Sequence, residues 1–459
     1  MKTDTIAAIA TAMAGSGIGI VRISGEEAVS ITDQIFHMPG GKKLSDMETH
    51  TIHYGHIRDG EEVIDEVMVL LMRGPRSYTR EDTVEIDCHG GVYVMKRILE
   101  TVIKYGARPA EPGEFTKRAF LNGRIDLSQA ESVIDVISAK NEFALKSSMK
   151  QLSGAVSDAV KEIRGEILHE IAFIESALDD PEHISLDGYG ERLELTIEGA
   201  VDRIEKLLAS SDNGRILKEG ISTVIVGKPN AGKSSLLNTL LGEERAIVTE
   251  IAGTTRDVLE EQINLNGIIL NIIDTAGIRD TDDIVEKIGV DKARKYVKDA
   301  DLILYVVDAS TNLDENDGEI MELLHGRRTI VLLNKSDLTP LTTAEDIRVH
   351  VDKDCPVISI SAREQKGIDV FTEQIRKMFF RGEVTFNDEV YITNIRHKTA
   401  LQEALSSLHL VEQSIADRMP EDFYSIDLMN AYEVLGTIIG EAVEDDLVNE
   451  IFSKFCMGK

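Results

Sequence analysis

The sequence contains no tryptophan and only three cysteines, which lie far apart at Cys88, Cys355 and Cys456. Because no two of them form a C-x-x-C pair, neither a disulfide framework nor a zinc site is indicated, and a reducing cytoplasm is favoured. An uninterrupted run of 18 apolar residues is also missing, so no membrane-spanning helix is predicted. The apolar stretch after Lys2 is mostly alanine and follows Asp4, which argues against a signal peptide.

Basic residues are scarce relative to acidic ones. The 459 residues include 81 Asp and Glu against 50 Lys and Arg, which gives a formal charge of −31. Nucleic-acid binders usually carry a basic surface, because phosphate contacts supply much of their affinity. Composition alone therefore argues against a nucleic-acid substrate. The 42% share of hydrophobic residues is ordinary for a globular protein, and the length favours about three domains.

Residues 1–118 read as an α+β domain. Val67–Met72 and Thr83–Cys88 are apolar runs of strand length, and Val92–Lys104 has the spacing of a helix. Ala107–Gly113 contains prolines and is predicted to be a loop.

Residues 119–217 and 382–459 carry helical patterns, and we interpret them as two parts of one all-α domain. In the first part, apolar residues recur every three or four positions and predict one stripe of a long helix. They are Leu152, Val156, Val160, Ile163, Ile167, Ile171, Ile174 and Leu178.

Residues 218–381 alternate between strand and helix patterns and predict an α/β domain inserted into the helical one. Continuous apolar runs favour a parallel sheet covered on both faces. The expected strands are Ile221–Val226, Ile268–Ile273, Leu302–Val307, Thr329–Leu333 and Val357–Ile360, and Asn266-Gly267 predicts a hairpin turn.

Gly227 to Ser234 reads Gly-Lys-Pro-Asn-Ala-Gly-Lys-Ser and lies between a predicted strand and a helix. This is the context of a P-loop, in which backbone N–H groups surround phosphates. Lys233 is then expected to contact the β and γ phosphates, and Ser234 to hold Mg²⁺.

Further motifs follow the later strands. Asp274–Gly277 stands where a Walker-B aspartate is expected, and Thr254 or Thr255 suits a switch threonine. Asp337 can pair with the two donors of a guanine edge, and Ser361–Arg363 is placed to support the base. These elements sit at strand ends, as ligand sites of open α/β sheets do. The domain resembles translation-factor-like GTPases, and GTP is favoured over ATP.

Ile278 follows the Asp274–Gly277 motif where Ras-like enzymes have a glutamine that orients the attacking water. An isoleucine cannot hydrogen-bond to water, so another route is needed. An arginine finger from a partner and a bound monovalent cation both remain open.

Several motifs together resemble the MnmE (TrmE) family of tRNA-modifying GTPases over essentially the whole chain. They are the P-loop continued by Ser235, Ile251–Asp257, Asp274–Arg279, Gly19–Gly25, Glu111–Asn122 and the terminal Cys456–Lys459. The resemblance implies a homodimer formed by N-terminal domains that bind 5,10-methylenetetrahydrofolate or 5-formyltetrahydrofolate. It also implies K⁺, in place of an arginine finger, and Mg²⁺ at the GTP site. With the FAD-dependent partner MnmG (GidA), in a heterotetramer or larger complex, such enzymes add an aminomethyl or carboxymethylaminomethyl group to C5 of the wobble uridine of certain tRNAs.

The resemblance also assigns residues. It assigns coordination of K⁺ to Asn230, Thr249, Ile251 and Thr254, and coordination of Mg²⁺ to Ser234 and Thr255. Glu286 is the expected catalytic residue, and Arg22, Glu85, Arg124 and Lys459 are the expected folate ligands. The expected GTP-binding residues are Asn230, Ala231, Gly232, Lys233, Ser234, Ser235, Thr249, Glu250, Ile251, Ala252, Gly253, Thr254, Thr255, Asp274, Thr275, Ala276, Gly277, Asn334, Lys335, Asp337, Ser361, Ala362 and Arg363.

Several of these positions have a plainer interpretation. Asn230 follows a proline and suits a turn, Glu286 suits the start of a helix, and the charged folate positions suit surface ion pairs. Cys456 could attack a uracil ring or could shape the folate pocket.

Two other functions also remain open: a GTP-switch factor of ribosome assembly, and a folate-dependent aminomethyltransferase acting on a protein. If tRNA is the substrate, the acidity predicts weak contacts by this chain, confined to patches such as Lys117, Arg118 and Arg124.

Overall fold

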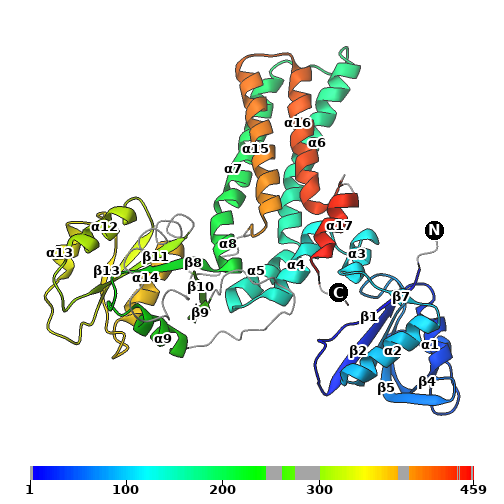
Figure 1. Ribbon diagram of the computed structural model, residues 1–459. Coiled ribbons are helices and arrows are strands. Elements are labelled where there is room, and N and C mark those ends of the chain that lie inside the picture. Colours follow the sequence, from blue (N-terminus) through cyan, green and yellow to red (C-terminus); the bar gives the residue numbers. More distant parts are fainter. Residues whose placement is uncertain are drawn as a thin grey trace. The chain divides into compact units, whose positions relative to one another are not determined.

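The computed structural model describes residues 4–243, 261–273, 300–380, 392–441, 443, 445–455 and 458. The chain divides into two compact units (Figure 1). One consists of Met1–Ile137, Met149–Arg203 and Thr399–Lys459, and the other of Ser138–Ser148 and Ile204–Lys398. The predicted fold class is confirmed: an α+β N-terminal part, a helical part and an α/β sheet are all present. The domain boundaries themselves stay a prediction.

A seven-stranded sheet occupies the N-terminal part of the first unit, in the order β3-β4-β5-β6-β2-β1-β7. Helices α1 and α2 pack on one of its faces over a buried aliphatic core. The bounds are β1 Ile6–Ile9, β2 Ile18–Ser24, α1 Ala28–Ile35, β3 Phe36–His37, β4 Thr51–Asp59, β5 Glu62–Met72, β6 Thr83–His89, α2 Val92–Lys104 and β7 Arg108–Pro109. Both predicted strands and the predicted helix of this region are confirmed.

Part of the predicted loop Ala107–Gly113 is instead strand β7, which pairs in parallel with β1. The Arg108 N–H donates to the Thr5 carbonyl and the Ala110 N–H to the Ala7 carbonyl, each at 2.9 Å. Pro109 stands between these two donors at the edge of the sheet. The missing N–H of proline is tolerated there, so a proline-containing segment can still close the sheet.

The helical part of the first unit contains α6, α16 and portions of α7 and α15, which run side by side in Figure 1. Arg164 of α6 is buried and joins α6 to α16. Its Nε donates to the Tyr432 carbonyl at 3.0 Å, and its guanidinium lies 4.0 Å from the centre of the Tyr432 ring. The bounds are α3 Glu114–Leu121, α4 Leu127–Ser138, α5 Glu142–Leu152, α6 Ala155–Asp179, α7 Tyr189–Ala209, α15 Ile395–Ala416, α16 Glu421–Ile439 and α17 Asp445–Ser453.

The predicted apolar stripe is confirmed from Val156 to Ile174 and is wrong at both ends. Leu152 ends α5, because Gly154 takes a φ of 105° and separates α5 from α6. Leu178 lies in the last turn of α6 and is 45% exposed. In the described part of the chain, no helix is long and apolar enough to cross a bilayer.

The second unit is built on a six-stranded sheet in the order β13-β12-β11-β8-β10-β9. Its pairs are parallel except that β9 runs antiparallel to β10 across the predicted turn, where Asn266 has a φ of 50° and Gly267 of 88°. Alternate residues of β11 enter two different hydrophobic clusters, so both faces are covered, as predicted. The bounds are α8 Ser211–Glu219, β8 Ile221–Val226, α9 Lys233–Glu243, β9 Glu261–Leu265, β10 Ile268–Ile272, β11 Leu302–Asp308, α12 Glu315–Leu324, β12 Thr329–Asn334, α13 Ala344–Arg348, β13 Val357–Ser359 and α14 Ile368–Phe380.

Candidate functional sites

The predicted P-loop joins the end of β8 to the start of α9, at the centre of the six-stranded sheet. Two of its glycines leave no room for a side chain. A Cβ on Gly227 would stand 2.3 Å from the Val306 carbonyl oxygen, and one on Gly232 would stand 2.2 Å from Nδ2 of Asn334. Both glycines also have positive φ, of 149° and 97°. The loop is therefore held closely against the ends of β11 and β12.

Lys233 begins α9 and folds back over the loop that precedes it. Its Nζ donates to the Gly227 carbonyl at 2.7 Å and to the Lys228 carbonyl at 2.8 Å. Burial lowers the pKa of Lys233, since an ammonium group loses hydration there. A phosphate would supply the countercharge that two neutral carbonyls do not, so the site favours an anionic ligand.

Asn334 connects the P-loop with the loop after β13. Its buried side-chain amide donates to the Ala231 carbonyl at 2.9 Å and accepts from the Ala362 N–H at 3.1 Å. The exposed Asp337 lies nearby in sequence, and its Oδ1 accepts a hydrogen bond from the Ser361 hydroxyl at 2.6 Å. That hydrogen bond lowers the pKa of Asp337 and keeps it an acceptor. Motifs predicted from three separate strand ends are thus brought together.

Lys335 and Arg363, also predicted at this site, lie in the same two loops. Lys335 has a φ of 64°, and its Nζ is 2.6 Å from Oδ2 of Asp308 at the end of β11. Arg363 directly follows Ala362 and is exposed.

Asn230 occupies the turn that the plainer interpretation predicted, with a φ of 63° and an exposed side chain. Ser234 and Ser235 are exposed in the first turn of α9. Cation binding by these residues stays a prediction. The remaining predicted residues lie outside the described residues; they are Thr249, Glu250, Ile251, Ala252, Gly253, Thr254, Thr255, Asp274, Thr275, Ala276, Gly277, Glu286, Cys456 and Lys459.

The predicted folate residues Arg22 and Glu85 lie opposite each other on β2 and β6. Their neighbours Val21 and Ile86 point into the core under the helices, so this pair faces the other side of the sheet. Arg22 Nε is 2.6 Å from Glu85 Oε1, and the two side chains are 15% and 16% exposed. Arg22 Nη1 also donates to the Gly458 carbonyl at 3.0 Å, so Gly458, close to the C-terminus, contacts this pair.

Tyr78 connects the third predicted folate residue, Arg124, with this pair. The Arg124 guanidinium lies 4.6 Å from the centre of the Tyr78 ring, and that of Arg22 lies 5.8 Å from it. The Tyr78 hydroxyl forms a 2.9 Å hydrogen bond with Thr116. Tyr78 could not be predicted from the sequence, because a single tyrosine in a loop carries no signal. Two guanidinium groups, a carboxylate and an aromatic ring suit a planar heterocycle with an anionic tail.

The same face of the sheet carries a half-buried acid and exposed apolar side chains. Among the described residues, Asp87 Oδ1 has no hydrogen-bond partner, and burial and the nearby Glu85 raise the pKa of Asp87. Ile52, Tyr54 and Met68 on β4 and β5 are 62%, 50% and 47% exposed. A contiguous apolar surface of this kind is typical of a protein–protein contact.

Arg118 does not belong to a tRNA-contacting patch, contrary to the sequence prediction. It is 7% exposed, and three carboxylates surround it. Its Nη atoms lie 2.9 Å from Asp4, 3.0 Å from Glu81 and 3.0 Å from Glu114. Through its ion pair with Asp4, Arg118 links α3 to the residues just before β1. Because it is enclosed, it cannot contact a tRNA phosphate at the surface.

The described cysteines Cys88 and Cys355 carry free thiols. Burial raises the pKa of each to about 11. Neither is therefore a thiolate at neutral pH, and neither can substitute for Cys456 as a nucleophile.

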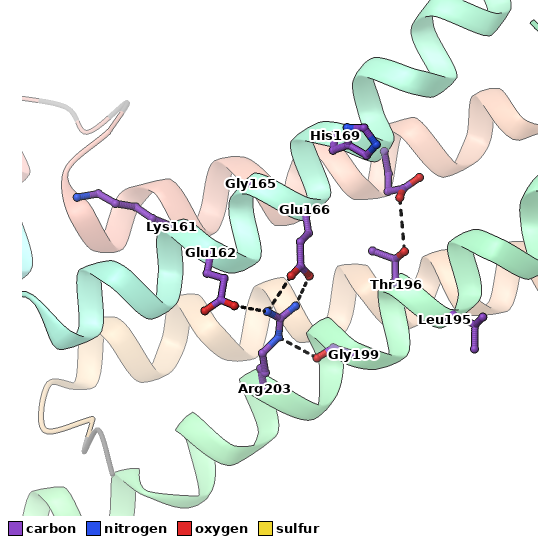
Figure 2. Close-up of a pocket in the computed structure, with 10 residues that line it drawn as sticks. Lys161, Glu162, Gly165, Glu166, His169, Leu195, Thr196, Gly199 and Arg203 are labelled. Carbon is purple, nitrogen blue, oxygen red and sulfur yellow. Dashed lines mark hydrogen bonds and ion pairs between the residues drawn. The ribbon is translucent and has the colours of Figure 1, made fainter. Parts of the chain in front are cut away.

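A groove of about 610 Å³ lies between α6 and α7 (Figure 2). Arg203 crosses it, pairing with Glu166 and with Glu162, while its Nε donates to the Gly199 carbonyl at 3.1 Å. The described lining contains none of the predicted site residues. We therefore assign it no part in binding nucleotide or folate.

Comparison with known proteins matches two family models to this chain. One is described as the MnmE helical domain and matches residues 127–456, and the other as the GTP-binding protein TrmE N-terminus, matching residues 5–124. Among solved structures, the G domain of the T. maritima FeoB iron transporter covers 35% of this chain and 98% of its own, at 21% identity and a TM-score of 0.26. At that TM-score the similarity supports no conclusion about the fold.

Similar curated proteins span the full length. The tRNA modification GTPase MnmE of Lachnoclostridium phytofermentans is 61% identical, over 100% of both chains. The proteins of that name from Alkaliphilus metalliredigens and Bacillus subtilis are 49% and 47% identical, over 99% of this chain and 99% and 100% of their own.

Proposed function

The chain belongs to the MnmE family of tRNA modification GTPases, and on that premise we propose that it couples GTP hydrolysis to the modification of a tRNA wobble uridine. The proposed product carries an aminomethyl or carboxymethylaminomethyl group at C5 of that base. A tetrahydrofolate bound to the N-terminal sheet supplies the one-carbon unit, and an FAD-dependent partner, MnmG, shares the reaction.

One observation carries the nucleotide part of this proposal: the ends of β8, β12 and β13 meet through Asn334. Its amide is bonded to Ala231 of the P-loop on one side and to Ala362 on the other. This connection would hold the loops that carry Lys233 and Asp337 at a constant distance from each other, with Lys233 at the phosphates and Asp337 at the base. Lys233 neutralises phosphate charge, and Asp337 accepts from the two donors of guanine.

Water activation is proposed to depend on K⁺ and on Glu286. Bound K⁺ supplies the positive charge that an arginine finger brings in other GTPases. The exposed amide oxygen of Asn230 is chemically suited to a monovalent cation. Glu286 orients the attacking water, a task that Ile278 cannot perform.

The N-terminal sheet is proposed to bind folate and to form a homodimer. Arg22, Arg124, Glu85 and the Tyr78 ring form a set that suits a pterin and its glutamate tail. The exposed apolar side chains of β4 and β5 support a second copy of this chain on that same face of the sheet.

Binding of tRNA by this chain alone is proposed to be weak. The net charge of −31 disfavours broad contact with phosphates, and Arg118 is enclosed. Most of the tRNA surface would then be bound by the partner protein. A ribosome-assembly factor remains the second candidate function, but it would not need a folate-type N-terminal domain.

The proposal is tested by measuring GTP hydrolysis by the full chain in KCl and in NaCl at equal ionic strength. Hydrolysis should be much faster in K⁺, and Glu286→Ala should abolish it while leaving GTP affinity nearly unchanged. Equal rates in the two salts would contradict the role of K⁺. A loss of GTP affinity in Glu286→Ala would show that Glu286 is structural.

A further inference from the structure

Lys228, the second residue of the P-loop, connects the loop to helix α12. Its Nζ lies 2.9 Å from Oδ2 of Asp314 and 2.5 Å from Oδ2 of Asp317. Asp314 is the N-cap of α12, and Asp317 is the third residue of its first turn. The lysine is thus bound to both carboxylates of one helix cap.

The cap that holds Lys228 is itself firmly built. The Asp314 side chain accepts from the Asp317 N–H, and the Asp317 side chain accepts in return from the Asp314 N–H at 3.0 Å. Asp317 is 1% exposed, and its Oδ1 accepts a 2.8 Å hydrogen bond from the buried hydroxyl of Tyr305 on β11. A buried carboxylate with these partners has little freedom to move.

The main chain of Lys228 takes part in the phosphate site. Its carbonyl accepts from Lys233 Nζ at 2.8 Å and from the Ala231 N–H at 3.3 Å. A displacement of Lys228 would therefore displace the loop that holds Lys233. The side chain and the main chain of this one residue join the α12 cap to the phosphate-binding lysine.

We propose that Lys228 is a positioning residue: its ion pair with Asp317 fixes the P-loop backbone in the geometry that receives the nucleotide phosphates. The inference rests on the proposed GTP binding. It adds a role for the side chain of the second P-loop residue, and for a helix cap that lies outside the GTPase motifs. The competing explanation is that the Lys228 charge attracts phosphate directly, without any need for Asp317.

Asp317→Asn separates these explanations, because it keeps the lysine charge and removes its buried partner. Positioning predicts that the dissociation constants of GTP and GDP both rise, by about five- to tenfold, which is the lower range of coupling between linked sites. The rate of GTP hydrolysis at saturating GTP should change little, because the substitution impairs binding of the nucleotide and not the chemical step that follows. Lys228→Met should weaken binding similarly, and Lys228→Arg should retain most of it.

Two control variants test whether a general loss of folding stability is enough to weaken nucleotide binding. Tyr305→Phe removes a hydrogen bond from Asp317 but leaves the Lys228 pair in place. Thr343→Ala removes the corresponding cap of α13, whose box is formed by Thr343 and Asp346. Both controls should lower the unfolding temperature while leaving nucleotide affinity within about twofold of the wild type.

The measurement is titration of the full chain with fluorescent GTP and GDP, together with thermal unfolding of each variant. Weaker binding by Asp317→Asn, with normal binding by Tyr305→Phe, would support the inference. Unchanged or tighter binding by Asp317→Asn would overturn it while leaving the proposed GTPase intact. The inference would also be overturned if Tyr305→Phe and Thr343→Ala lowered nucleotide affinity as much as Asp317→Asn does. If the wild type failed to bind GTP, the proposed function would be overturned as well.

Discussion

Arg22 and Glu85 form an ion pair across β2 and β6, with 2.6 Å between Nε and Oε1. A second nitrogen of Arg22 is bound to the Gly458 carbonyl at 3.0 Å. One side chain therefore joins the N-terminal sheet to Gly458, from which it is separated by most of the sequence. Because both groups are largely enclosed, the pair is ordered before any ligand arrives.

Arg22→Ala should weaken tetrahydrofolate binding by roughly 1.5–3 kcal/mol, or about 10- to 150-fold, because a charge-assisted contact is lost. Calorimetric titration with 5-formyltetrahydrofolate measures the change. Arg97→Ala is the matched control, since Arg97 pairs at 3.0 Å with an exposed Glu62 on the same sheet. Equal affinities for wild type and Arg22→Ala would contradict the folate role.

Lys233→Met should abolish GTP binding without lowering the unfolding temperature of the nucleotide-free protein. Burial lowers the pKa of Lys233, so its charged form costs stability in the folded state. That cost is present at neutral pH and is lost as pH rises through the lowered pKa toward the usual value of 10.5. Any stability gained by the variant should therefore shrink at alkaline pH.

Thermal unfolding between neutral and alkaline pH tests this prediction, with Lys366→Met as a control for the loss of an exposed charge. A marked destabilisation of Lys233→Met at neutral pH would mean that its bonds to the Gly227 and Lys228 carbonyls outweigh the burial of charge.

Asp337→Asn should shift nucleotide preference from GTP to XTP, because the amide presents a donor where guanine also presents one. The Ser361 hydroxyl can still hold the oxygen of an asparagine, so the loop geometry is kept. Competition between GTP and XTP for hydrolysis measures the shift. If the variant bound neither GTP nor XTP, the loop would have collapsed instead. Ser361→Ala would show how much nucleotide binding depends on the orientation of the Asp337 side chain.

Arg118→Ala should destabilise the N-terminal part by about 3–5 kcal/mol, because it leaves the enclosed carboxylate of Glu81 without its Arg118 countercharge, whereas Glu114 keeps its ion pair with Arg108. Glu81 and Glu114 are both largely enclosed beside it. Denaturant unfolding measures the loss, and Lys117→Ala on the preceding, more exposed residue is the control. A fully stable Arg118→Ala with weakened tRNA binding would restore the original interpretation of a basic patch.

Elements with strong local patterns could be predicted from sequence. β8 and α2 have the predicted ends, because a continuous apolar run and a glycine-bounded amphipathic segment determine them locally. The Asn266-Gly267 turn follows from the backbone freedom of those two residues. The GTP motifs were identified because each one lies within a few residues of a strand end.

Features that depend on distant partners were missed. β7 exists only because β1 offers carbonyls to Arg108 and Ala110, which no local pattern reveals. The buried state of Arg118 depends on carboxylates from three separate segments. Tyr78 and Lys228 gained a role only when folding brought them to Arg124 and Asp317.

Under the proposed function, cells need this chain to modify tRNA wobble uridines. The most direct measurement is nucleoside analysis of bulk tRNA from cells that lack the gene, beside cells that carry the wild-type gene or Lys233→Met. We expect the C5-aminomethyl-type uridines to disappear in the deletion, to return with the wild-type gene and to stay absent with Lys233→Met. Unchanged wobble uridines in the deletion strain would contradict the proposed function.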